Sequence, residues 1–346
     1  CYKKLNMSKK NSIVLNHKSC FEKSKRIQEI YKNFKSQITK FKSNKFLAAI
    51  SGGPDSLALA AMSKVYENEN KRKKFYYAIV NHGIRNNAKA ECLFVKKILK
   101  KHGINIKIIT NKRKIKKNIQ HLARKVRYEA LINECKRKNI KNLLVAHHRE
   151  DQIETFLIRL SRGSGVQGLS AMSDIYPTGR GIKILRPFLN TKKIDLIYVS
   201  KKVFGTFIKD PSNNSQKFLR VRVRKLLPIL KKSGIAEEQI IKSINHLKTS
   251  NNTINRYIDQ ASKKVFTKRK KEFLVKYKEF LLLNYEIQIK LLGRIVKKLT
   301  GKDYPPRSKK LSFALNLINA NHKKRYLFGG CLMRNDGRTI FIRKIT

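Results

Sequence analysis

The stretch "FLAAISGGPDSLALAAM", residues 46–62, decides the fold class that we expect for this chain. Residues 46–50 are apolar and indicate a buried strand, and an apolar helical pattern resumes after the intervening Ser-Gly-Gly-Pro-Asp-Ser. In an open α/β sheet, ligands bind beyond the carboxyl ends of the strands, where residues 51–56 would lie. Two glycines there let backbone N–H groups approach an anion closely, so the loop predicts a phosphate-binding site at the start of a helix.

The loop at residues 51–56 carries an acid where a Walker A motif would have a lysine. No lysine lies between Ser51 and Met62, whereas Asp55 lies inside the loop. A carboxylate beside phosphate groups is expected to hold Mg²⁺ between itself and the nucleotide. An ordinary Gly-Pro turn, with Asp55 as a helix cap, is the alternative. The residues that we expect to bind the nucleotide here are Ser51, Gly52, Gly53, Pro54, Asp55 and Ser56.

Short apolar runs alternate with longer helical patterns from residue 46 to about residue 190. This alternation predicts an α/β fold, a mostly parallel sheet with helices on both faces. The expected strands are 46–50, 75–80, 104–110, 143–146 and 182–185. The expected helices are 56–66, 88–102, 119–138 and 151–160.

The predicted secondary structure changes after Pro211: strand signals disappear, and helical patterns continue to about residue 321. Two β-rich runs near the end flank Asn-Asp-Gly at 335–337, a strong hairpin signal. We therefore expect four parts: a basic extension (1–40), an α/β domain (41–212), a helical domain (213–322) and a small C-terminal β-hairpin (323–346).

The charge of the chain favours a polyanionic partner. Its 346 residues include 81 Lys and Arg against 22 Asp and Glu, a formal net charge of +59. Nucleic acid is the first expectation and an acidic membrane surface the second, while a general preference for lysine accounts for part of the excess. The five cysteines are scattered and form no C-x-x-C pair, which indicates free thiols in a reducing compartment. Since no apolar run approaches the roughly 18 residues of a membrane span, we expect a cytoplasmic protein.

A second informative stretch is "LLVAHHREDQIETFLIRLSRGSGVQGLSAM", residues 143–172. An apolar strand runs into two histidines, and the helix that follows carries Asp151 and Glu154 on one face because they are three residues apart. These carboxylates could share a metal ion, hold a cationic substrate or act as acid and base. The alternative is that they cap the helix and that the histidines pack in the core.

Both stretches resemble known enzymes. The loop is similar to the S-G-G-x-D-S signature of the PP-loop ATP pyrophosphatases, and residues 147–165 resemble the pattern H-H-x-x-D-Q-x-E-T-x-L-x-R-L-x-R-G-S-G of the tRNA(Ile)-lysidine synthetase family. The segments "VNHGIR" (80–85), "ARKVRYEAL" (123–131), "RPFL" (186–189) and "KDPSNNSQKFLRVRVRKLLPIL" (209–230) continue the likeness. The resemblance is strong over residues 46–230 and weaker in the rest of the chain.

The resemblance implies a specific reaction. ATP and Mg²⁺ would serve to adenylate the C2 oxygen of the wobble cytidine in a CAU-anticodon tRNA(Ile). The amine of free L-lysine would then displace AMP, giving lysidine and switching decoding from AUG to AUA. It also implies a PP-loop fold of the adenine nucleotide alpha-hydrolase-like kind, and it leaves a homodimer open.

The resemblance also assigns roles to residues. Asp55, Asp151 and Glu154 would be catalytic, with Asp55 as the metal ligand. Asn81 and His82 would bind the nucleotide together with the loop at residues 51–56. The resemblance also implies that several arginines bind tRNA; the alternative for each of them is that it simply lies on a solvent-exposed face of a helix. Val221 departs from the family, which usually has Asn there, so the neighbouring arginines Arg220 and Arg224 are the weaker assignments. The arginines implied to bind tRNA are Arg85, Arg124, Arg127, Arg159, Arg162, Arg220 and Arg224.

Two rival functions fit parts of the same sequence. One is another PP-loop enzyme, a tRNA thiolase, although Cys92 and Cys135 lack the paired cysteines that such enzymes tend to need. The other is a non-enzymatic RNA-binding protein with a degenerate nucleotide fold, against which the acids Asp55, Asp151 and Glu154 argue.

Overall fold

The computed structural model describes residues 21–81, 83, 87–111, 119–209, 218–269, 272–302, 305–320 and 325–345. The chain divides into two compact units, the first up to Asn245 and the second from His246 onward, and each is described by itself. The four-part division expected from the sequence stays a prediction. Among the described helices, none combines the length and apolar character that crossing a membrane requires.

The first unit is built on a six-stranded sheet with the strand order β3-β2-β1-β4-β6-β5. All described pairings in it are parallel except the one between β5 and β6. The mostly parallel sheet is thereby confirmed, although β5 was not expected. The strands are β1 (Lys45–Ile50), β2 (Lys74–Asn81), β3 (Ile106–Thr110), β4 (Asn142–Leu144), β5 (Ile175–Pro177) and β6 (Lys183–Leu185).

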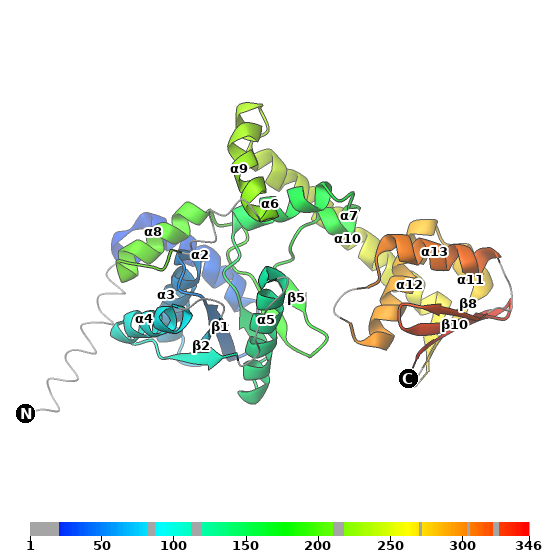
Figure 1. Cartoon of the computed structure of the whole chain (residues 1–346), viewed down its shortest axis with the longest axis horizontal. Helices are drawn as coiled ribbons and strands as arrows, with labels where there is room; N and C mark the ends of the chain where they lie inside the picture. Colours follow the sequence, from blue (N-terminus) through cyan, green and yellow to red (C-terminus); the bar gives the residue numbers. More distant parts are fainter. Residues whose placement is uncertain are drawn as a thin grey trace, which may run out of the picture. The chain divides into compact units, whose positions relative to one another are not determined.

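Helices cover both faces of this sheet (Figure 1). The side chains of the central strand β1 enter an apolar core on each face. Phe46, Ala48 and Ile50 enter one apolar core, which also receives side chains from α2, α3, α4 and α8. Leu47 enters a second core, which it shares with α5. Alternate residues of a strand point to opposite faces, so a strand that is apolar throughout is buried on both sides. The helices concerned are α2 (Lys25–Thr39), α3 (Pro54–Glu69), α4 (Ala88–Lys101), α5 (Ile119–Arg137) and α8 (Lys193–Phe204).

Helix α2 belongs to the core of the first unit. Ser24 caps it by accepting a hydrogen bond from the backbone N–H of Ile27. Ile27, Ile30, Phe34 and Ile38 are buried and lie on one face at helical spacing. Within the basic segment 1–40, the residues from Ser24 onward are therefore part of the packed fold.

A smaller apolar cluster joins the last helices of the first unit. Ile153 and Ala171 pack with Leu227 from α9 and with Ile240 and Ile244 from the start of α10. This packing fixes α6, which carries the acids Asp151 and Glu154, against α9. The helices are α6 (Arg149–Leu160), α7 (Val166–Leu169), α9 (Leu219–Lys232) and α10 (Glu237–Val265), whose C-terminal part belongs to the second unit.

The second unit combines helices with a five-stranded antiparallel sheet of order β7-β8-β11-β10-β9. The expected terminal hairpin is present as β10 and β11, joined by a turn in which Gly337 has φ +91° and donates to Oδ1 of Asn335. The β7–β8 hairpin lies where only helices were expected, so that part of the sequence prediction was wrong. The elements are β7 (Phe266–Lys268), β8 (Glu272–Lys276), α11 (Tyr277–Leu281), α12 (Tyr285–Thr300), α13 (Ser308–Ala320), β9 (Arg325–Phe328), β10 (Cys331–Asn335) and β11 (Thr339–Lys344).

Candidate active site

The loop between β1 and α3 is closed by the hydroxyl of Ser56. This oxygen accepts hydrogen bonds from the backbone N–H groups of Ser51 and Gly52, both at 3.1 Å, and donates to the carbonyl of Gly53 at 2.9 Å. Gly53 is the N-cap of α3, and Pro54 occupies its first turn. In this structure Ser56 therefore organises the loop, while the N-terminus of α3 provides the positive end of a helix dipole.

Gly52 is required by both backbone conformation and space. Its φ of +87° is one that residues with a side chain rarely adopt. A Cβ atom there would lie 2.6 Å from Cγ2 of Val95 and 2.9 Å from Cδ1 of Ile208. The backbone N–H of Ile208 also donates to the Gly52 carbonyl at 2.9 Å. The loop is thus fixed from behind by α4 and by the segment that follows α8.

Asp55 in the first turn of α3 is partly buried, and its carboxylate lacks a full set of partners. Burial raises its pKa, an effect that the nearby His148 opposes. Its Oδ2 lies 3.8 Å from Nε2 of His148, while its Oδ1 is buried without a hydrogen-bond partner among the described residues. A buried carboxylate oxygen of this kind fits a cation.

Within the described ranges, no group of three or more His, Cys, Asp or Glu side chains is arranged to hold a metal ion. Mg²⁺ commonly binds through one or two carboxylates together with substrate phosphates, so a single acid at the phosphate loop fits it.

His148, directly before α6, lies among three carboxylates. Its Nδ1 is 3.0 Å from Oε2 of Glu150, and its Nε2 is 3.6 Å from Oδ2 of Asp151 as well as near Asp55. Burial lowers the pKa of this imidazole, but the three acids outweigh burial and raise it overall. Conversely, His148 is the main influence that holds the pKa of Asp151 below its usual range despite burial. The histidine thus links the acid of the phosphate loop to the first acid of α6.

Glu150 was not expected in the site. Both of its carboxylate oxygens accept from the backbone N–H of Lys193 at 3.0 Å, at the start of α8, and the side chain also holds His148. Burial opposes ionisation, but these contacts lower its pKa overall. An acid in the first turn of a helix is common, so the sequence held no signal for this role.

Glu154, one turn further along α6, is fully buried and paired with Arg224 of α9. Nε and Nη2 of Arg224 contact the same oxygen, Oε1, at 2.8 and 2.7 Å. Burial raises the pKa of Glu154, the Asp151 carboxylate adds to this, and Arg224 opposes both. The side chain of Arg224, implied by resemblance to bind tRNA, is therefore engaged with an acid of the site.

The pKa of His147 is shifted in the opposite direction to that of His148. Burial and the neighbouring arginines hold its pKa at about 3, although Asp151 opposes them. Nε of Arg186 donates to its Nδ1 at 3.3 Å, and Nη2 of Arg124 lies 3.3 Å from its Nε2. A neutral imidazole between two guanidinium groups forms a positive region beside the acids. Arg186 was noted only as part of a motif, because its pairing depends on the tertiary fold.

The other expected nucleotide-binding residue that can be placed, Asn81, lies at the end of β2. Its Oδ1 accepts from the backbone N–H of Gly83 at 3.0 Å. Asn81, Ser51 and Arg127 line one small pocket beside the loop. The predicted residues His82 and Arg85 lie outside the described residues.

The remaining predicted arginines have different surroundings. Arg159 donates to the carbonyls of Gly168 and Ala171, both at 2.7 Å, and so holds the segment after α6. Arg162 is exposed, and the charge of Arg220 contributes to lowering the pKa of Asp151. The structure therefore brings Arg220 near the acids and Arg124 beside His147.

The sequences of known proteins are similar to this chain over most of its length. A family model described as a PP-loop domain matches residues 22–230. A tRNA(Ile)-lysidine synthase from Wolbachia pipientis wMel is 35% identical over 87% of this chain and 71% of the relative. The chain belongs to the tRNA(Ile)-lysidine synthase family. Another member of the family, from Rhodopseudomonas palustris, is 33% identical over 75% of each chain.

Among solved structures, a U34-tRNA thiolase from Methanococcus maripaludis, with its [4Fe-4S] cluster, has a TM-score of 0.55 at 18% identity and covers 64% of this chain and 79% of its own. That likeness shows the PP-loop fold alone. As a tRNA(Ile)-lysidine synthase family member, the chain is a ligase-type enzyme that uses ATP and modifies tRNA(Ile). The family matches favour this function over the thiolase alternative.

Proposed function

We propose that this site makes lysidine in two steps at C2 of the wobble cytidine. In the first step, the C2 oxygen attacks the α-phosphorus of ATP, and pyrophosphate leaves. In the second, the amine of L-lysine attacks C2, the C2–O bond breaks, and AMP leaves with that oxygen while the amine loses its proton. The observation that carries this proposal is the approach of Asp55 and Asp151 to one atom, Nε2 of His148, at 3.8 and 3.6 Å.

The loop residues would bind and orient the triphosphate. The N-terminus of α3 would face the leaving phosphates, and Gly52, where a Cβ atom would meet Val95 and Ile208, would let the loop backbone pack closely behind them. Asp55 would hold Mg²⁺, which when bound neutralises charge on the phosphate oxygens. The buried and unpartnered Oδ1 of Asp55 supports this assignment.

The acids of α6 would hold the incoming lysine. Asp151 stays ionised in its surroundings, and Oε2 of Glu154 is buried without a hydrogen-bond partner among the described residues. An ammonium group placed between them would satisfy that oxygen and gain two ionic contacts. Arg224 would serve to keep Glu154 ionised rather than to bind RNA.

The positive region around His147 would receive the RNA. The guanidinium carbons of Arg124 and Arg186 lie 5.1 and 5.9 Å from the ring centres of Tyr128 and Tyr176. Guanidinium groups beside aromatic rings suit a phosphate or an unstacked base of the anticodon loop. Arg127, Arg159, Arg162 and Arg220 stay proposed tRNA contacts, and the helical part after residue 213 would hold the stem.

The deciding experiment is mass spectrometry of CAU-anticodon tRNA(Ile) after incubation with the protein, ATP, Mg²⁺ and lysine. We expect the mass increase of lysine joined with loss of water, and pyrophosphate release that depends on tRNA. A mass increase only with a sulfur donor would favour a thiolase. Folded protein that binds tRNA without releasing pyrophosphate would favour a non-enzymatic RNA-binding protein.

Two further assignments accompany this function. We place the enzyme in the cytoplasm, because its substrates tRNA, ATP and lysine meet there. A homodimer stays a prediction, which light scattering of the purified chain would check. Neither assignment affects the chemistry proposed above.

A further inference from the structure

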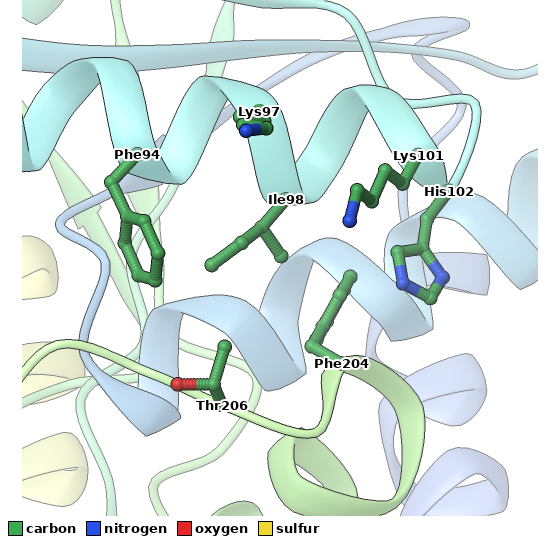
Figure 2. A pocket seen from close by; sticks show the side chains of 7 residues that line it. All are labelled: Phe94, Lys97, Ile98, Lys101, His102, Phe204 and Thr206. Carbon is green, nitrogen blue, oxygen red and sulfur yellow. The ribbon is translucent and has the colours of Figure 1, made fainter.

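A pocket of about 270 Å³ lies between α4 and the end of α8, and none of the site residues described above lines it (Figure 2). Figure 2 shows Lys97 and Lys101 on α4 on one side and Phe204 and Thr206 on the other. No acidic residue contributes to its lining. The pocket is therefore a concave, positively charged feature that the proposed chemistry leaves unused.

The two lysines share one face of α4. They are four residues apart, so their side chains are neighbours on the helix surface. Both are exposed, and neither forms an ion pair with a residue in the described part of the chain. Two unneutralised cations at this spacing can contact consecutive anionic groups of one ligand.

Aromatic rings complete the pocket. Phe94 is 45% exposed, although it is a large apolar side chain, and it opens onto the pocket. Opposite lies Phe204, whose ring meets that of His102 edge to face at 4.8 Å between centroids. Burial and the charge of Lys101 lower the pKa of His102, so its ring is neutral near pH 7. Flat apolar surfaces beside cations match the chemistry of a nucleotide, a planar base joined to phosphate.

We propose that this pocket binds an unpaired nucleotide of the bound tRNA outside the wobble position. The base stacks on Phe94, and the flanking phosphates contact Lys97 and Lys101. The proposal rests on the proposed function, which provides an RNA substrate. RNA is recognised chiefly where bases are unstacked and can lie on aromatic side chains.

Helix α4 places this pocket behind the phosphate loop and along the side of the sheet. Helix α4 follows the carboxyl end of β2 and returns alongside the sheet, as the crossover to the parallel strand β3 requires. At about 1.5 Å per residue, Lys101 lies roughly 9 Å along the helix from Val95, which packs behind Gly52 of the phosphate loop. The pocket would therefore extend the RNA-binding surface down the side of the domain.

Charge reversal at equal net charge tests the phosphate contacts. The test variant is Lys97→Glu with Lys101→Glu, and the matched control is Lys96→Glu with Lys100→Glu, which changes exposed lysines of the same helix outside the pocket. Binding of tRNA(Ile) is measured at several salt concentrations without ATP or lysine. We expect the pocket variant to bind more than about tenfold more weakly than the control, with a salt slope reduced by about two units. Equal effects of both variants would overturn the proposal.

Substitution of the exposed apolar residues tests stacking. Phe94→Ala should weaken tRNA binding by roughly tenfold, whereas Leu93→Ala, at a residue that is 51% exposed on the same helix, should not. Circular dichroism of each variant checks that it is folded. Saturable binding of free AMP that Phe94→Ala abolishes, with unchanged tRNA affinity, would assign the pocket to a free nucleotide and contradict the RNA contact.

This test is independent of catalysis. A wild-type chain that binds tRNA through the pocket but makes no lysidine would contradict the proposed function alone. A chain that makes lysidine, yet responds identically to the pocket and control variants, would contradict the pocket alone.

Discussion

Arg224 on α9 pairs with Glu154 on α6 through a single carboxylate oxygen, Oε1, at 2.7–2.8 Å, and the second oxygen, Oε2, is buried without a hydrogen-bond partner in the described structure. Glu154 is 0% exposed, whereas Arg224 is 36% exposed in its side chain. A buried acid that depends on one cation is a vulnerable arrangement, because loss of the cation leaves an uncompensated charge. The consequence for stability can be measured.

Arg224→Met should destabilise the protein, because it leaves Glu154 buried and unpaired. We expect a loss of about 2–3 kcal/mol, below the full cost of breaking a buried pair because Arg224 is partly exposed. Adding Glu154→Gln to this variant should restore much of the stability, since the buried charge is then gone. Urea unfolding measures both effects, with the exposed Arg222→Met on the same helix as control. Equal unfolding midpoints for Arg224→Met and the control would contradict the assignment.

Gly52→Ala should disable the phosphate loop. The new methyl group would meet Val95 and Ile208 closer than 3 Å in a backbone conformation that alanine resists. Displacing the loop by even about 1 Å can reduce the rate by roughly 100-fold, so pyrophosphate release should fall by this order. The matched control is Gly181→Ala, where φ is +77° but nothing lies within 4 Å. Similar activity of the two variants would mean that close packing behind the loop does not matter.

Much of the fold could be predicted because its signals are local. The apolar run of β1 is followed by glycines and a helix, and that order alone indicates a parallel strand ending at a phosphate loop. The terminal hairpin was equally accessible, since Asn-Asp-Gly favours one turn. In contrast, β5 and β7 have only three residues each, too few for an alternating pattern, and their pairing depends on distant neighbours.

The site divides in the same way. The acids Asp55, Asp151 and Glu154 could be predicted from motifs, because the motifs specify their spacing and their positions on helices. The side chains that set the ionisation of these acids could not be predicted from the sequence. Glu150 accepts from the backbone of Lys193 only because α8 begins beside it, and Arg186 reaches His147 only because β6 pairs with β4. These contacts join residues up to 43 positions apart, and no local pattern predicts them.

The stability of the protein should depend on pH through His148. Its folded pKa lies above the ordinary value of about 6.5, so its contribution is fully present below that pH and is lost as pH rises through the folded pKa. Glu150 and Asp151, with lowered pKa values, contribute above about pH 4 and lose that contribution as pH falls through their folded pKa values.

His148→Gln should therefore make the free energy of unfolding depend less on pH. Measured without Mg²⁺, its fall between pH 6 and about 8 should be smaller than in the wild type by about 1.4 kcal/mol for each unit of pKa shift removed. His246→Gln, at an exposed histidine of α10, is the control. If both variants retain the wild-type pH dependence, the three carboxylates do not bind the charged imidazole.

Asp55→Asn should abolish tRNA conversion while the protein stays folded. Burial already disfavours the charged form of Asp55, so a neutral side chain of the same size costs little stability and relieves a buried charge. Without the carboxylate, nothing at the loop would hold the metal against the phosphates, and pyrophosphate release should fall by about 10²–10⁴-fold. Added Mg²⁺ should not restore it. Asp195→Asn, which changes an acid in the first turn of α8 that pairs with Arg26, is the matched control and should keep near-normal activity. A folded Asp55→Asn variant that releases pyrophosphate at the wild-type rate would show that this carboxylate takes no part in the chemistry.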